Sequence, residues 1–115
     1  MSWESSLAWY RLANQQVHAR LGGHHSARIL LDSLDFAEIE ALQAQDDWDS
    51  AGALLADRAR ALEAAGAEIL VLATNTMHLV ADRITDAVGI PFLHIADAAG
   101  AAVSGAGLAT VGLLG

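Results

Sequence analysis

The sequence feature that most constrains the fold is an unbroken apolar run, Ile69-Leu70-Val71-Leu72-Ala73. It lies between two stretches in which apolar residues recur every three or four positions, the spacing of amphipathic helices. A short apolar run of this kind suits a strand that is covered on both faces, and such strands are typical of parallel sheets with helices on either side. The run therefore predicts an α/β protein.

The spacing of apolar residues along the rest of the chain predicts helices that alternate with strands. Helices are expected at residues 3–21, 36–43, 48–65, 76–88 and 98–104, and strands at residues 28–33, 69–73, 91–95 and 109–114. Helices between strands form βαβ crossovers, so we expect three αβα layers around a mainly parallel sheet. The side chains expected to face the core are Trp3, Leu7, Tyr10, Val17, Leu21, Phe36, Ile39, Leu42, Trp48, Leu55, Ala59, Leu62, Met77, Val80, Ile84 and Val88.

The two ends of the chain depart from the usual pattern of such a domain. A doubly wound sheet normally opens on a strand, whereas this chain opens on a helix. The chain also stops at the predicted strand 109–114, before any helix that could cover it. We therefore expect residues 1–115 to form a single partial domain of a longer protein, with the first strand of the sheet outside this sequence.

Charge and composition argue against several classes of function. Six arginines and no lysine oppose fourteen acidic residues, which gives a net charge of −8. Nucleic acids and anionic membrane surfaces require clustered positive charge, so we expect neither partner. The chain has no cysteine, hence no thiolate ligand or cysteine nucleophile. Its start, Met1-Ser2-Trp3-Glu4, does not resemble a signal peptide, and no apolar run approaches a membrane span. We expect a cytoplasmic protein.

The turn after the apolar run, Thr74-Asn75-Thr76, is the candidate binding site. In open α/β sheets, ligands bind beyond the carboxyl ends of the strands, beside the N-termini of helices. The turn places two hydroxyls and an amide together with backbone N–H groups at a helix start, an arrangement that can hold a carboxylate. Threonine and asparagine also cap helices and form turns, so a structural role stays open. Phosphate binding is disfavoured because the turn lacks glycine.

The histidines do not form a recognisable metal site. None of them shows the HxxxH or HxH spacing of metal ligands, and the adjacent pair His24-His25 is typical of a solvated loop. His78 lies in the first turn of the predicted helix and could reach the candidate site. As a lone histidine it is most simply a hydrogen-bonded structural residue. We therefore expect no metal.

Four short blocks occur in an order shared with a known family: Met1-Ser2-Trp3-Glu4-Ser5-Ser6, Ser33-Leu34-Asp35-Phe36-Ala37-Glu38-Ile39, Thr74-Asn75-Thr76-Met77-His78 and Ile90-Pro91-Phe92-Leu93-His94-Ile95. Together they resemble the N-terminal half of the aspartate/glutamate racemases, and the resemblance covers essentially the whole chain. These enzymes are cofactor-independent amino-acid racemases built from two similar α/β domains with the active site between them. The resemblance implies half of that architecture, no cofactor, and a small acidic amino acid, aspartate or glutamate, as substrate.

Racemisation requires two acid/base groups on opposite faces of Cα. The family usually supplies a cysteine from each domain, and the position that matches the first of them is Thr74. The resemblance thus implies a threonine-for-cysteine subtype in which Thr74 is the acid/base on one face and the other domain supplies the second. By the same resemblance, Asn75 and Thr76 hold the α-carboxylate, and Ser2 and Trp3 lie in a loop that borders the site.

A lone half-domain of this type would expose a sheet edge and an apolar face. We therefore expect association with the absent C-terminal domain or a homo-oligomer, such as a dimer. The activity of residues 1–115 alone is left open. So are two alternatives to a racemase: a non-catalytic module that binds a carboxylate or associates with itself, and, more distantly, a decarboxylase of related fold.

Overall fold

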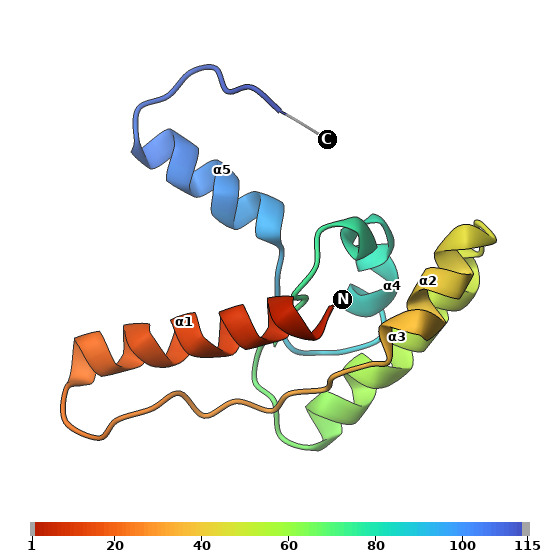
Figure 1. Cartoon of the computed structure of the whole chain (residues 1–115), viewed down its shortest axis with the longest axis horizontal. Helices are drawn as coiled ribbons and strands as arrows, with labels where there is room; N and C mark the ends of the chain where they lie inside the picture. Colours follow the sequence, from red (N-terminus) through yellow and green to blue (C-terminus); the bar gives the residue numbers. More distant parts are fainter. Residues whose placement is uncertain (1, 114–115) are drawn as a thin grey trace.

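A computed structural model describes residues 2–113 of the chain as helices around a small parallel sheet (Figure 1). In chain order the elements are α1 (Trp3–Leu21), α2 (Phe36–Ala44), α3 (Trp48–Ala64), β1 (Leu70–Val71), the 3-10 helix η1 (Thr76–Val80), α4 (Ala81–Thr85), β2 (Phe92–Leu93) and α5 (Ile95–Gly105). The α/β class with parallel strands is confirmed. None of the helices in this part of the chain combines the length and the apolar content that a membrane crossing requires.

Local capping explains where α3, the central helix, begins and ends. The side chain of Asp47 accepts a hydrogen bond from the backbone N–H of Ser50 at 3.0 Å. Hydrogen bonds from the backbone and side chain of Ser50 also lower the pKa of Asp47, because they stabilise the ionised carboxylate. At the other end Gly66 has a φ of 96°, a left-handed conformation that glycine adopts at little cost after a helix.

The sheet of the described residues consists of β1 and β2, paired in parallel with Leu70 opposite Phe92 and Val71 opposite Leu93. The backbone N–H of Leu70 donates to the carbonyl of Pro91 at 2.8 Å, so pairing begins just before the assigned strands. The connection between the strands runs through η1 and α4. Pairing in parallel brings the carboxyl ends of both strands to one edge of the sheet.

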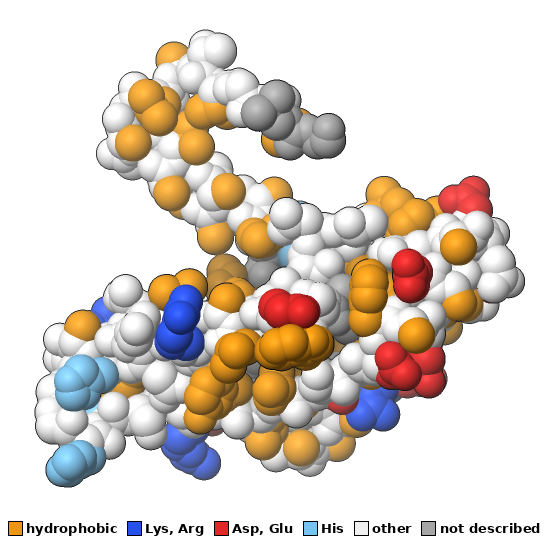
Figure 2. Space-filling view, viewed as in Figure 1, with side chains coloured by type: hydrophobic (Ala, Val, Ile, Leu, Met, Phe, Trp, Pro, Cys, Tyr) orange, Lys and Arg blue, Asp and Glu red, His pale blue; other side chains and the backbone are white. Residues whose placement is uncertain are grey.

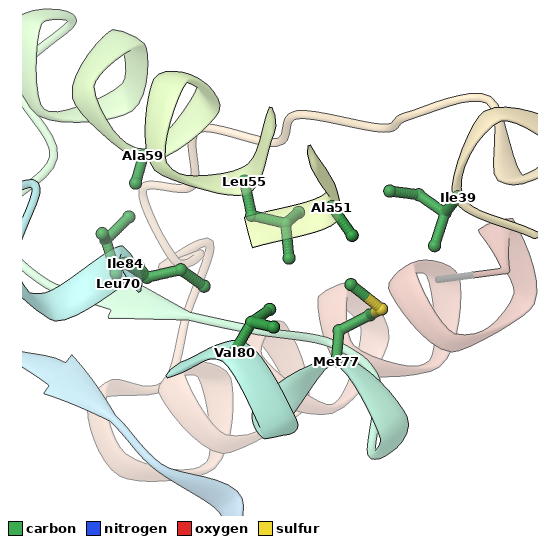
Figure 3. Close-up of a cluster of buried hydrophobic side chains, with 8 residues drawn as sticks. All are labelled: Ile39, Ala51, Leu55, Ala59, Leu70, Met77, Val80 and Ile84. Carbon is green, nitrogen blue, oxygen red and sulfur yellow. The ribbon is translucent and has the colours of Figure 1, made fainter. Parts of the chain in front are cut away.

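The hydrophobic core lies where α3 packs against α2, η1 and α4 (Figure 3). Met77 and Ile39 are its largest fully buried side chains, and Gln43 Nε2 lies 3.1 Å from Met77 Sδ as a hydrogen-bond donor. Gly52 allows α3 and α4 to approach closely, since a Cβ there would lie 2.8 Å from Arg83 Cγ. The side chains that form the core are Ile39, Ala51, Leu55, Ala59, Leu70, Met77, Val80 and Ile84.

Two predicted strands are wrong. Residues 28–33 belong to a long irregular segment that crosses the molecule between α1 and α2 without joining the sheet (Figure 1). Residues 109–113 are likewise irregular, and Leu114, the last position of that predicted strand, lies outside the described residues. A strand exists only where a second edge supplies its hydrogen bonds, and neither segment has such an edge beside it.

The first helix is also less buried than its pattern predicts. None of the residues of α1 is buried, and Trp3 and Leu21 are 66% and 64% exposed. The radius of gyration is 15.7 Å, against about 13 Å for a compact chain of about 100 residues, which reflects this open arrangement. Figure 2 shows apolar side chains open on the surface, including along α5 and the segment that follows it.

Smaller differences concern single helices. Phe36, expected in the core, is 39% exposed at the start of α2. The helix expected at residues 76–88 begins as η1, continues as α4 and ends at Thr85. The helix expected at residues 98–104 begins earlier, at Ile95, because the imidazole of His94 accepts a hydrogen bond from Ala96 N and caps the helix there.

Candidate functional site

The candidate site is the turn Thr74–Thr76, which follows β1 at the carboxyl edge of the sheet. The backbone N–H of Thr74 donates to the carbonyl of Leu72 at 2.9 Å and bends the chain sharply after the strand. The carbonyl of Asn75 then accepts from the N–H of His78 at 3.0 Å, which starts η1. Beneath the turn, the fully buried Met77 fixes the chain to the core.

The side chains of this turn and the backbone N–H groups of Asn75 and Thr76 make no hydrogen bonds within the described residues. Thr74 is half-buried, and Asn75 and Thr76 are exposed. The capping role that threonine and asparagine often play is therefore not in use here, because η1 has no side-chain cap. These groups are free to bind a ligand.

The helix start beside the turn is weaker than the sequence predicts. An α-helix from Thr76 would direct a helix dipole at the turn. The structure has a single short stretch of 3-10 helix instead, and α4 begins only at Ala81. Short 3-10 helices have poorer hydrogen-bond geometry and little cumulative dipole. The donors that this turn offers are therefore individual groups, namely the backbone N–H groups and the side chains of Asn75 and Thr76.

Two histidines lie behind the turn and join η1 to α5. The Nε2 atom of His78 accepts a hydrogen bond from the N–H of Ile95 at 3.4 Å. The rings of His78 and His94 pack edge to face, with 4.4 Å between the ring centroids. Phe92 flanks both rings. Since Nε2 accepts, Nδ1 of a neutral His78 carries the proton, and this buried atom has no partner in the described chain. His78 thus has the hydrogen-bonded structural role that was expected.

The position of His94 was not recognised from the sequence. Its signal is the strand register: Leu70 pairs with Phe92, so the residue after β2 lies at the same sheet edge as the turn after β1.

Ser2 and Trp3, the other predicted site residues, lie at the start of α1. The Ser2 hydroxyl accepts from the N–H of Ser5 at 3.4 Å and caps the helix, while Trp3 is largely exposed. No hydrogen bond joins either residue to the turn 74–76 within the described chain. Ser6 of α1 and Ala73, which follows β1, line one cavity of about 120 Å³.

Charged groups near the turn are sparse. Arg58 is paired with Asp32, Arg60 with Asp57 and Arg83 with Asp49, and none of these arginines bonds to the turn. In the described part of the chain, no group of three or more His, Asp or Glu side chains is arranged to hold a metal ion.

Comparison with known proteins gives one family. A sequence model described as Asp/Glu/Hydantoin racemase matches residues 1–115. A crystal structure from Yersinia pestis, described as a proposed Asp/Glu racemase, is 55% identical with a TM-score of 0.89. A crystal structure of an aspartate racemase homologue from Pyrococcus horikoshii OT3 is 29% identical with a TM-score of 0.78.

Each of these two structures matches 92% of this chain, which spans 46% of each solved protein. The chain thus covers just under half the length of these relatives. The match over its whole length shows that the chain belongs to the Asp/Glu/Hydantoin racemase family.

Proposed function

We propose that this chain is part of an aspartate/glutamate-type amino-acid racemase that inverts Cα of a small acidic amino acid by cofactor-independent proton transfer between two bases. The observation that carries the proposal is the turn at Thr74–Thr76, whose side chains make no hydrogen bonds within the described residues, placed at the carboxyl edge of a parallel sheet in a chain of this family. That edge is where α/β proteins bind their ligands.

In this proposal, Asn75 and Thr76 hold the α-carboxylate of the substrate. Their backbone N–H groups, the Asn75 amide and the Thr76 hydroxyl are donors without partners in the described chain. When the α-proton leaves Cα, negative charge spreads onto the carboxylate. Donors already oriented toward that carboxylate stabilise the carbanion-like state more than the ground state, and this difference lowers the barrier.

Thr74 is the proposed acid/base group on one face of Cα. It is half-buried at the end of β1, next to the donors of Asn75 and Thr76. A hydroxyl is a far weaker base than a thiolate, so Thr74 needs activation by a neighbouring base or a water relay. The two stereochemical directions should then differ in kcat and in KM, because the two faces of Cα meet unlike groups, while kcat/KM stays equal because the two enantiomers have the same free energy.

The second acid/base group belongs to another domain in this proposal. We take residues 1–115 to belong to one partial domain, because the relatives are about twice as long as the part matched here. We further propose that Ser2 and Trp3, at the start of α1, border the substrate site. The arginines of this half that form ion pairs do not reach the turn, so we assign recognition of the substrate's side-chain carboxylate to the opposing domain.

The test uses the protein expressed from the complete reading frame, incubated with each enantiomer of aspartate and glutamate in deuterated water. We expect deuterium at Cα of one of these amino acids, measured by proton NMR. Thr74→Ala should abolish racemisation and confine exchange to the enantiomer whose α-proton faces the second base, whereas Thr74→Cys should retain racemisation and change the ratio of the two kcat values. Thr85→Ala removes a hydroxyl outside the site and is the matched control. A folded protein that exchanges none of the four substrates would overturn the proposal.

A non-catalytic binding module is the second candidate. The observation in its favour is that the turn 74–76 presents donors suited to a carboxylate, while no second base faces these donors in the described residues. Calorimetric titration of the 115-residue chain with D- and L-aspartate separates the two functions. Saturable binding by this chain, together with no exchange by the complete protein, would favour the module.

A further inference from the structure

Two imidazoles accept the first two N–H groups of α5. The Nε2 atom of His78, in η1, accepts from the N–H of Ile95 at 3.4 Å, and the Nδ1 atom of His94, at the N-cap, accepts from the N–H of Ala96 at 3.1 Å. Donors in the first turn of a helix have no partner inside the helix, so they depend on acceptors of this kind. An imidazole nitrogen accepts only while it carries no proton. Both rings must therefore be neutral for the two hydrogen bonds to exist.

His78 also links the start of α5 to the candidate turn. Within residues 2–113, the hydrogen bond from Ile95 to His78 is the one that joins α5 to another helix or strand, and none of the residues of α5 is buried. The N–H of His78 in turn donates to the carbonyl of Asn75 at 3.0 Å. The ring of Phe92 packs against both histidine rings. The contacts of His78 thus hold α5 and the turn in one arrangement.

A further proton on either ring works against this arrangement. The buried Nδ1 atom of neutral His78 already carries its proton, so the next proton goes to Nε2 and meets the N–H of Ile95. On His94 the next proton goes to Nδ1 and meets the N–H of Ala96. Each proton replaces a hydrogen bond by two opposed donors and adds a positive charge at a helix N-terminus, which the helix dipole disfavours. With 4.4 Å between the ring centroids, charges on both rings also repel each other.

Charged side chains on the neighbouring elements do not take over these contacts. β2 has no charged residue, and η1 has no titratable residue besides His78. On α5, Asp97 lies in the first turn, where its charge attracts a protonated His94 and offsets part of the cost. The charged residues of α3 and α4, the helices that pack on η1, are Asp49, Asp57, Arg58, Arg60, Glu63, Asp82 and Arg83. None of them hydrogen-bonds to either imidazole within the described residues, and the three arginines are paired with aspartates.

We propose that His78 and His94 form an acid-sensitive latch, which holds the start of α5 against η1 while both rings are neutral and releases it when they are protonated. The released state binds more protons than the latched state, so its population grows as the pH falls. Imidazoles ordinarily acquire their charge between roughly pH 8 and pH 5, and the latch opens within that range. Opening also frees the side chain of the residue that closes the candidate turn.

NMR of the isotope-labelled 115-residue chain, recorded from about pH 8 down to about pH 5, tests the latch. Two readouts report release: the nuclear Overhauser contact between the His78 ring and the Ile95 amide, and the helical Cα shifts of residues 95–98. We expect both to be lost in one shared step as the pH falls. The signals of Leu55, in the core, should keep their folded positions through this step. A wild-type chain that keeps both readouts at pH 5, or loses them only together with the folded signals of Leu55, would overturn the proposal.

Substitutions identify the two histidines as the groups responsible. His78→Gln combined with His94→Asn replaces each accepting nitrogen by an amide oxygen that does not titrate, and asparagine is a good N-cap, so this variant should keep the start of α5 helical at every pH tested. His24→Asn combined with His25→Asn removes two exposed loop histidines and is the matched control, which should release α5 as the wild type does. His94→Asn alone serves if the first variant does not fold, and it should release α5 less completely at pH 5 than the wild type. Release that persists unchanged without the latch histidines, or that disappears without the loop histidines, would overturn the proposal.

Discussion

Asp32 and Arg58 form a two-point pair that ties the irregular segment after α1 to α3. Arg58 Nε lies 2.6 Å from Asp32 Oδ2, and Arg58 Nη2 lies 2.9 Å from Asp32 Oδ1. The hydrogen bonds and the charge of Asp32 raise the pKa of Arg58 further above its already high value, so the guanidinium stays charged. Because residues 28–34 have no backbone hydrogen bonds in the described chain, this pair is a main restraint on their position.

Loss of the Asp32 carboxylate should therefore loosen this segment. We expect Asp32→Ala to speed cleavage by trypsin after Arg28 by several-fold, since a protease needs a locally mobile backbone. Asp57→Ala is the matched control, because it removes an exposed pair with Arg60 within one turn of α3 and should leave cleavage at Arg28 unchanged. Mass spectrometry of early digests measures both rates. Equal rates for the two variants would show that the Asp32–Arg58 pair does not hold the segment.

A core prediction concerns Leu55, which is 4% exposed at the centre of the α3 packing (Figure 3). We expect Leu55→Ala to lower the free energy of unfolding by about 2–5 kcal/mol, through lost burial and the cavity left behind. Ile39→Val should lower the free energy of unfolding by about 0.5–1.5 kcal/mol. This milder variant tests the same core if Leu55→Ala does not fold. Leu79 is 70% exposed, so Leu79→Ala should change the free energy of unfolding by no more than about 0.5 kcal/mol. Urea unfolding followed by circular dichroism measures all three; similar losses for Leu55 and Leu79 would contradict this core.

The sequence predicted best what depends on one segment at a time. The cap Asp47 and the glycine Gly66 bound α3 almost where expected. The apolar run 69–73 contains the strand β1, but Leu70 alone of its five residues is buried, so the expected cover on both faces is not present. Whether residues 28–33 form a strand depends on a second edge beside them, and no pattern within those residues contains that information. The prediction that α1 buries its apolar side chains is wrong for a similar reason. Those side chains are buried only where another surface covers them, and the sequence of α1 does not say whether such a surface is present.

The candidate site was predictable in place but not in detail. Chain order alone puts Thr74–Thr76 after the buried strand, and parallel topology then puts that turn at the binding edge. The 3-10 geometry of η1, whose Met77 and Val80 are buried in the core, was not predicted from the sequence. The neighbourhood of His94 depends on strand register, which the sequence does not specify.

The close approach of α3 and α4 predicts opposite effects at two helical glycines. Replacing glycine by alanine inside a helix normally adds up to about 1 kcal/mol of stability. At Gly52 the new methyl group would meet Arg83 Cγ at 2.8 Å and Arg83 Cβ at 3.3 Å, and overpacking of this kind costs about 1–3 kcal/mol. At Gly100, in α5, nothing lies within 4 Å. We expect Gly52→Ala to lower the midpoint of thermal unfolding and Gly100→Ala to leave the midpoint unchanged or raise it. A Gly52→Ala variant that is more stable than the wild type would show that α3 and α4 can accommodate the added methyl group.

The lowered pKa of Asp47 predicts an acid-dependent contribution to stability. Hydrogen bonds from Ser50 favour the carboxylate in the folded chain, so its folded pKa lies below its unfolded value of about 4. A depressed folded pKa gives stability that is fully present above the unfolded pKa and is lost as pH falls through the folded pKa. An asparagine side chain also caps helices but has no titrating group, so Asp47→Asn removes this pH-dependent part alone.

Urea unfolding of the wild type and of Asp47→Asn, repeated from neutral pH down to about pH 3, measures the effect. We expect the wild type to be more stable relative to the variant above about pH 5, and this advantage to shrink steadily in acid as the carboxylate is protonated in both states. Asp57→Asn, at an exposed position within α3 whose partner Arg60 lies one turn away, serves as the control for general loss of negative charge. A difference in free energy of unfolding between the wild type and Asp47→Asn that stays constant with pH would contradict this prediction. It would show that the cap stabilises the helix equally with a charged and with a neutral Asp47 carboxyl.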